Sequence, residues 1–130
     1  MEDEQPISFV GTTASGATSE HVHEFEEPSV ITRAKVVTHR GQQYALQQDA
    51  TLIRDGSRTG LWESVDRDFI AGNGQVFDLP MRFEVTRGDK LVLEAENVNQ
   101  DGNEYHHNMH VTVDREGIVS RLSDRLRRVI

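Results

Sequence analysis

The sequence predicts an all-β domain, an antiparallel β-sandwich of jelly-roll-like form, on three observations. Apolar and polar residues alternate with a period of two along much of the chain, as expected of strands with one buried face. Short strands separated by Gly, Asn and Asp turns recur at roughly ten-residue spacing, which is typical of a sandwich or barrel. Helical periodicity is confined to the last residues.

The clearest strands lie between Leu79 and Val113, where we predict three antiparallel strands joined by two turns. Gly88 and Asp89 form the first turn, because Gly accepts a positive φ and Asp bonds its own backbone. A polar loop from Asn99 to Asn103 forms the second. The residues predicted to face the core alternate with polar ones: Met81, Phe83, Val85; Leu91, Leu93, Ala95; Tyr105, His107, Met109, Val111 and Val113.

Shorter strands precede this region. We predict them at Glu20–Phe25, Val30–His39, Tyr44–Leu52, Leu61–Trp62, Phe69–Ile70 and around Phe77. Turns at Arg40-Gly41, Asp55-Gly56 and Gly72-Asn73-Gly74 separate them. The predicted organisation is a flexible N-terminal arm over 1–19, a sandwich domain over 20–117, and a basic C-terminal helical tail over 118–130.

The N-terminal arm is predicted from the Gly/Ser/Thr tract between Gly11 and Ser19, which has little to bury. A short apolar patch around Phe9 precedes the tract. One interpretation is that Phe9 binds a neighbouring copy by adding a strand to the edge of its sheet. The other is a simple disordered terminus.

Composition excludes several classes of protein. The 130 residues contain no Cys, so there is no disulfide framework and no thiolate site, and no apolar run predicts a membrane span or an export signal. The net charge is −8, and only two of the 14 basic residues are lysines. This acidic, Lys-poor composition resembles that of proteins from halophilic archaea and their viruses; the alternative is an ordinary acidic bacterial protein.

The C-terminal tail carries the opposite charge to the rest of the chain. Four arginines against one aspartate give residues 118–130 a charge of +3, which leaves −11 for residues 1–117. Leu122, Leu126 and Val129 or Ile130 fall at helical spacing, with arginines on the other face. The tail either packs on its own domain or docks on a partner, whereas nucleic acid is disfavoured by the acidic body. The predicted partner-binding residues are Phe9, Arg121, Leu122, Arg125, Leu126 and Arg128.

Histidines are the main candidates for chemistry. His21, His23 and Glu27 have the H-x-H-x(3)-E spacing of the first cupin motif, which they resemble over about a dozen residues. The resemblance implies a metal-dependent enzyme with a divalent metal held by these three residues. The family's fourth ligand has no counterpart in the pattern, and His107 is left as an open candidate for it. The family's preceding Gly is displaced by one position here and its second motif is absent. The other interpretation is that the histidines lie on solvated or partly buried strand faces and bind no cofactor.

Other catalytic signatures are missing, including the Gly-x-Ser-x-Gly elbow and a phosphate-binding Gly-rich loop. Glu94 and Glu96 fall on the polar face of their strand, where acid/base work would need a cleft. Trp62 with Tyr44 and Tyr105 would suit a sugar-stacking platform in a carbohydrate-binding sandwich. A single Trp in a small sandwich is more often core.

A second resemblance covers about 35 of the 130 residues. From Leu79-Pro80 through Gly88-Asp89 to Asn97 and the closing strand, the pattern resembles small jelly-roll proteins of tailed viruses, which serve as capsid decoration, turret or fibre-base subunits. The resemblance implies symmetric assembly and no catalytic residues. We therefore predict a non-enzymatic virion subunit, made in a host cytoplasm, whose partners are itself and a major capsid or other virion protein, with no nucleic acid or membrane.

Overall fold

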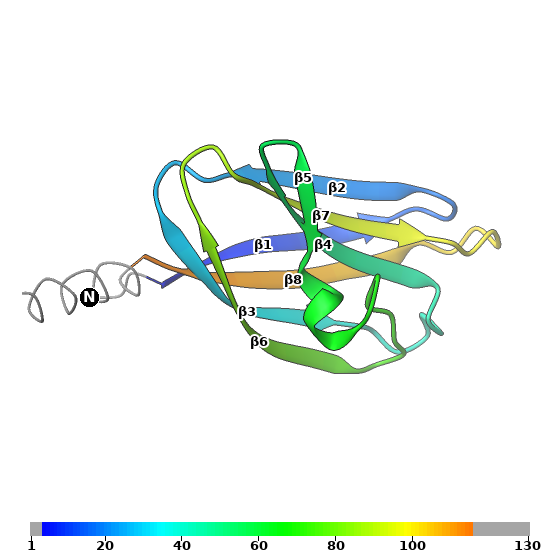
Figure 1. Ribbon diagram of the computed structural model, residues 1–130. Helices are drawn as coiled ribbons and strands as arrows, with labels where there is room; N and C mark the ends of the chain where they lie inside the picture. The colour runs from blue at the N-terminus through cyan, green and yellow to red at the C-terminus, as the bar shows by residue number, and fades with distance from the viewer. Residues whose placement is uncertain (1–3, 116–130) are drawn as a thin grey trace, which may run out of the picture.

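The computed structural model describes residues 4–115; residues 1–3 and 116–130 lie outside the described part. Eight strands and one short 3₁₀ helix make up this part (Figure 1). They are β1 (Glu4–Thr13), β2 (Thr18–Glu24), β3 (Ser29–Val37), β4 (Leu46–Arg54), β5 (Ser57–Gly60), η1 (Leu61–Val65), β6 (Val76–Val85), β7 (Lys90–Asn97) and β8 (Tyr105–Asp114). No helix within residues 4–115 is long and apolar enough to cross a bilayer.

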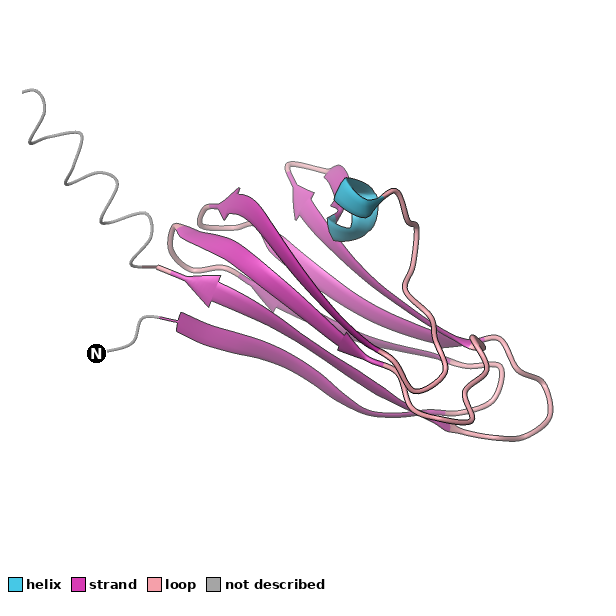
Figure 2. Ribbon diagram, turned by 90° about the horizontal axis from the view of Figure 1, so that it is seen from below, coloured by secondary structure: helices cyan, strands magenta, loops and turns pink. Residues whose placement is uncertain are grey.

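The strands form two antiparallel sheets that pack face to face (Figure 2). The first sheet has the order β1-β8-β3-β6 and the second sheet the order β2-β7-β4-β5. Among the described strands, β4 and β5 alone are both consecutive in the chain and hydrogen-bonded, and every other connection crosses between the sheets. This is the strand order of a jelly roll, so the predicted fold class is confirmed.

The three strands predicted between Leu79 and Val113 correspond to β6, β7 and β8, and the alternation indicated the inner face of each. Met81, Phe83 and Tyr105 are only partly buried, however, and Val92 on the outer face of β7 is 8% exposed. The three strands do not pair with one another. β8 lies between β1 and β3, β6 is the outer strand beside β3, and β7 belongs to the second sheet. Alternation tells which face of a strand is buried but carries no information about its neighbour.

The N-terminal segment differs from the flexible arm that the sequence predicted. Residues Glu4–Thr13 form β1, which pairs with β8 along its whole length. Ile7 and Phe9 are 8% and 6% exposed, and the Phe9 ring stacks on His107 of the same chain at 4.1 Å between centroids. Phe9 is thus a core residue here and not a contact for a neighbouring copy. Burial of these two alternating side chains explains why a segment poor in large residues is ordered.

Polar side chains tie the two sheets together inside the core. Gln48 of β4 is fully buried, and its Oε1 accepts a hydrogen bond from the Asn108 backbone N–H at 3.1 Å in the opposite sheet. Trp62 of η1 is also fully buried and donates its Nε1–H to the Gln48 carbonyl at 3.2 Å. Trp62 is therefore a core residue, which was the alternative to the sugar-binding interpretation. It cannot form a sugar platform with Tyr44, which is 60% exposed.

An ion pair closes one end of the sandwich. Arg54, at the end of β4, donates through Nε and Nη2 to Asp89 Oδ2 at 3.0 and 2.6 Å. Its Nη2 also donates to the Glu84 carbonyl at the end of β6, at 2.8 Å. The same Asp89 oxygen accepts from the Thr86 backbone N–H at 2.9 Å. Asp89, which is 4% exposed, thus holds Arg54 of the second sheet in the position from which Arg54 reaches the Glu84 carbonyl of the first sheet.

Candidate functional site

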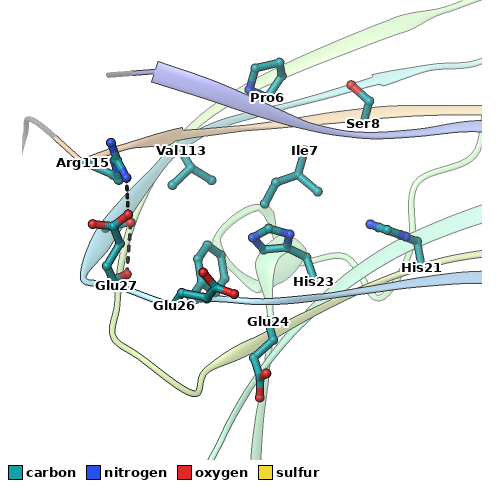
Figure 3. A pocket seen from close by; sticks show the side chains of 12 residues that line it. Pro6, Ile7, Ser8, His21, His23, Glu24, Glu26, Glu27, Val113 and Arg115 are labelled. Carbon is teal, nitrogen blue, oxygen red and sulfur yellow. Dashed lines mark hydrogen bonds and ion pairs between the residues drawn. The ribbon is translucent and has the colours of Figure 1, made fainter. Parts of the chain in front are cut away.

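A cavity of about 520 Å³ lies between β1 and β2, which are the outer strands of the two sheets. Each of these strands has one edge without a strand partner among residues 4–115. Ile7, Phe25 and Val113 supply apolar lining, and each is less than a tenth exposed. His21 and His23 supply polar lining (Figure 3).

The two histidines enter the cavity because of the register of β2. His21 and His23 lie opposite Leu93 and Leu91 of β7, whose side chains belong to the core. Partners in register share a face of the sheet, so both imidazoles lie on the inner face. Figure 3 shows them on the side of β2 that faces β1. The His23 ring also meets the edge of Phe25 at 4.9 Å between centroids.

The protonation of His23 is set by its surroundings. Burial lowers the pKa of His23, the nearby His21 lowers it further, and Glu26 acts in the opposite direction. At neutral pH this imidazole is therefore mainly uncharged, which is the form that accepts a hydrogen bond or ligates a metal.

Glu27 lines the same cavity and is paired there with another lining residue. Its carboxylate forms an ion pair with Arg115, the last described residue of the chain (Figure 3). Within residues 4–115 no group of three or more His, Cys, Asp and Glu side chains is placed to hold a metal ion. The structure thus brings His21, His23 and Glu27 to one cavity without arranging them as a ligand set.

The remaining histidines lie away from this cavity. His107 is 5% exposed on β8, shares a 2.8 Å hydrogen bond between its Nδ1 and Thr13 Oγ1, and stacks on Phe9. A Cβ atom on Gly11 would come within 3.0 Å of the His107 ring, so the two residues pack closely across the β1–β8 pair. Burial lowers the pKa of His107, with the charge of His106 a second cause. His107 is structural in this position and not the further ligand of the cupin resemblance.

A second feature lies on the outer face of the second sheet and was not found in the sequence. Glu20 of β2 is opposite Glu94 of β7, and Glu94 is opposite Asp49 of β4. We call Glu20, Glu94 and Asp49 the acidic row. Burial raises the pKa of Glu94, and the charges of Glu20 and Asp49 raise it further, against Arg58. Burial also raises the pKa of Asp49, more than its hydrogen bonds lower it.

A row of two valines and a threonine runs beside the acidic row, and we call Val22, Val92 and Thr51 the apolar row. Val22 of β2 lies opposite Val92 of β7, which lies opposite Thr51 of β4. Val22 is 47% exposed, whereas Val92 is 8% exposed. The sequence correctly placed Glu94 on a polar strand face, but its two acidic neighbours come from strands about 45 and 75 residues away. Only the strand order β2-β7-β4 reveals the row.

No family model matches the chain, and no curated protein matches it. Among solved structures, an infectious bursal disease virus structure (Gx strain) matches at a TM-score of 0.45 and 14% identity, covering 84% of this chain and 31% of that one. A VP2 subviral particle of the same virus matches at 0.46 and 14%, covering 85% and 32%.

A third match is a Yersinia pseudotuberculosis-derived mitogen, at a TM-score of 0.40 and 10% identity, covering 85% of each chain. The present chain spans about a third of the length of the viral chains. All three TM-scores are below 0.5, so these matches add no argument about function.

Proposed function

We propose that this chain is a non-enzymatic structural subunit of a virus particle, which assembles as a symmetric homo-oligomer. More specifically, the protein is a capsid decoration, turret or head–tail component of a tailed virus with a salt-loving host. It is made in the host cytoplasm and binds a major capsid or other virion protein. Nucleic acid and membrane are not proposed as partners.

The observation that carries the proposal is the jelly-roll strand order of the two sheets. Jelly rolls are characteristic of viral capsid and lectin domains and of cupins. Because one fold hosts several functions, the choice among these three depends on particular residues. Trp62 is fully buried, which removes the aromatic platform of a lectin-like site. Glu27 is paired with Arg115, and His107 is packed on Phe9, so two members of the cupin ligand set are engaged.

The charge distribution supports assembly further. A body of −11 and a tail of +3 within one chain provide opposite charges that can meet between copies. Salt screens the longer-range repulsion between acidic bodies, with a Debye length of about 3 Å at 1 M. Assembly in high salt is therefore compatible with the net charge of −8.

The test is the molar mass of the purified full-length protein, measured by light scattering in low and high salt over a range of protein concentrations. We expect a discrete oligomer of one stoichiometry at high salt, with rotational symmetry visible by electron microscopy. A monomer at every salt and protein concentration would contradict the proposal. Immunogold labelling of particles released by the producing host tests the location in the virion.

A second candidate function is a cupin-like metal protein, and the shared position of His21 and His23 in the cavity favours it. Imidazole nitrogens are ligands that suit Zn, Ni or Fe. Metal content measured on the same purified sample tests this candidate. Stoichiometric metal that is lost in the His21→Ala/His23→Ala variant would support it over the structural role.

A further inference from the structure

The outer face of the second sheet has an excess of negative charge. Alternation places five carboxylates and two cations on this face: Glu20, Glu24, Asp49, Glu94 and Glu96 against Arg58 and Lys90. The acidic row is its centre, where three carboxylates stand side by side on adjacent strands. Like charges directly opposite each other destabilise a sheet, and within residues 4–115 the positive charge of Arg58 opposes only part of the row's mutual repulsion.

Resting on the proposed function, we infer that the acidic row and the apolar row beside it bind the C-terminal segment 116–130 of a second copy of this chain. The segment is the most basic part of the sequence, with Arg121, Arg125, Arg127 and Arg128 against Glu116 and Asp124. Charge complementarity therefore identifies this segment as the occupant, since the remainder of the chain is strongly acidic.

The pattern of the segment matches the pattern of the surface. In the helix that the sequence predicts, Leu122, Leu126 and Val129 form an apolar stripe, and the arginines one residue before each of them form a basic stripe alongside it. On the sheet, the apolar row and the acidic row are likewise adjacent, two residues or about 7 Å apart along the strands. A helix lying across the strands would place leucine side chains on Val22 and arginine side chains on the acidic row.

The lengths also match. Three neighbouring strands at about 4.8 Å spacing give each row a length of roughly 10 Å. From Arg121 to Arg128 a helix rises seven steps of about 1.5 Å, which is also roughly 10 Å. Guanidinium groups pair with carboxylates in a planar, bidentate manner, which suits arginine better than lysine at such a row.

A second copy is favoured over the chain's own tail by the place where the described chain ends. Arg115 follows β8, which lies in the first sheet, and it is tied to Glu27 at the end of the cavity. The acidic row lies on the outer face of the second sheet, and the two sheets are about 10 Å apart. Along β2, its member Glu20 is four residues before the end of the strand. The six residue steps from Arg115 to Arg121 extend about 20 Å at most, which leaves little chain to pass around the sheet edge.

The experiment uses full-length variants and light scattering at the salt concentration where the wild type is oligomeric. We expect Arg121→Glu/Arg125→Glu and, separately, Glu20→Lys/Glu94→Lys to raise the dissociation constant of the oligomer by at least about ten-fold, because each reversal turns an attraction into a repulsion. Glu104→Lys, an exposed change in the β7–β8 loop, is the matched control and is expected to leave the oligomer intact.

Mixing the two reversed variants in equal amounts is the decisive step. Reversed tails can then bind only reversed sheets and normal tails only normal sheets, so association is expected to return in the mixture. Two folded, monomeric variants that do not associate when mixed would overturn the inference. The inference is also overturned if both variants associate as strongly as the wild type, and that outcome does not contradict the proposed function. A wild type that is monomeric throughout contradicts the proposed function itself.

A milder variant covers the possibility that Glu94→Lys unfolds the sheet. Glu20→Gln/Glu94→Gln removes the repulsion within the row and is expected to fold at least as well as the wild type, yet to associate several-fold more weakly. A purely structural role of the two glutamates would not weaken association while preserving the melting temperature. Unchanged association in this variant would overturn the inference.

Discussion

The outer faces of the two sheets are built by the same alternation but treat their charges differently. On the first sheet, two ion pairs lie on the outer face: Arg33 Nε lies 3.0 Å from Asp78 Oδ1, and Arg82 Nη2 lies 3.4 Å from Glu84 Oε1. Ser8 Oγ also shares a 2.9 Å hydrogen bond with His110 Nδ1. On the second sheet, the carboxylates of the acidic row face one another. The first face carries two ion pairs, whereas the second has a row of three carboxylates whose charge a partner can neutralise.

In a jelly roll, which hosts several functions, the outer faces of the sheets are where one protein differs from another. Burial of one strand face determines stability and leaves the other face free to vary. In this chain one free face is balanced and the other is acidic, with the exposed Val22 beside the acidic row. Hydrogen bonds hold the two sheets together, among them the bond from the Asn108 backbone N–H to Gln48 and the bond from Arg54 to the Glu84 carbonyl.

The largest effect on stability is expected from Asp89→Asn. Asp89 is nearly fully buried, and Arg54 donates two hydrogen bonds to its carboxylate from the end of β4, the strand paired with β7 in the same sheet. Loss of the charge removes a buried, charge-assisted interaction, and we expect the free energy of unfolding to fall by about 2 kcal/mol in chemical denaturation at neutral pH. Asp55→Asn, an exposed change at a position of positive φ that Asn accepts, is the matched control.

The same pair predicts a dependence on pH. The hydrogen bond from Arg54 holds the pKa of Asp89 below its ordinary value of 3.8, although burial opposes it. A lowered carboxyl pKa gives stability that is present above 3.8 and is lost as the pH falls through the folded-state pKa. The difference between wild type and Asp89→Asn should therefore disappear in strong acid. A difference that persists there would show that the ion pair is not its cause.

The next effect concerns His107, which anchors β1 to β8 behind the first face. Burial lowers its pKa below 6.5, as it does for His23, so the unfolded chain binds these protons more readily than the folded chain. Stability should decline as the pH falls below 6.5 and level off below the folded-state pKa. Denaturation of the wild type and His107→Gln across this range measures the slope, which should be shallower in the variant. Equal slopes would exclude His107 as a source.

A smaller gain is expected from Glu94→Gln on the acidic face. Burial and the charges of Glu20 and Asp49 raise the pKa of Glu94 above its ordinary value of 4.5. The penalty for ionising it is absent below 4.5 and grows as the pH rises through the folded-state pKa. In the Arg121→Glu/Arg125→Glu background, where association does not contribute, the free energy of unfolding should rise by about 0.5 kcal/mol at neutral pH and be unchanged in acid. A loss at neutral pH would contradict mutual repulsion in the row.

The smallest effect is expected on the balanced face. Arg33 and Asp78 are about half exposed, so their ion pair is screened by solvent and should contribute less than about 0.5 kcal/mol. A double-mutant cycle of Arg33→Gln and Asp78→Asn measures this coupling. A coupling as large as the loss in Asp89→Asn would show that the two faces differ less than the geometry indicates.

Local pattern was sufficient for most of the fold. The strands from Met81 to Val113 were predicted with the correct inner face, because a period of two marks the face of a strand wherever the chain places it. The prediction failed at β1, because Ile7 and Phe9 become buried only once β8 is beside them. It failed also at Leu61–Trp62, which was predicted as a strand and instead begins the 3₁₀ helix η1. The predicted helical tail, with Arg121, Leu122, Arg125, Leu126 and Arg128, lies outside the described residues and stays a prediction.

The sequence by itself therefore determined the all-β class, the turns and the buried face of most strands, since these follow from steric preferences and alternation within ten residues. The tertiary structure alone decided that β7 lies between β2 and β4, and with it the alignment of Glu20, Glu94 and Asp49. It also decided that His21 and His23 share a cavity while His107 packs on Phe9. The physical reason is that strand neighbours are chosen by burial over the whole sandwich, which no short stretch of sequence encodes.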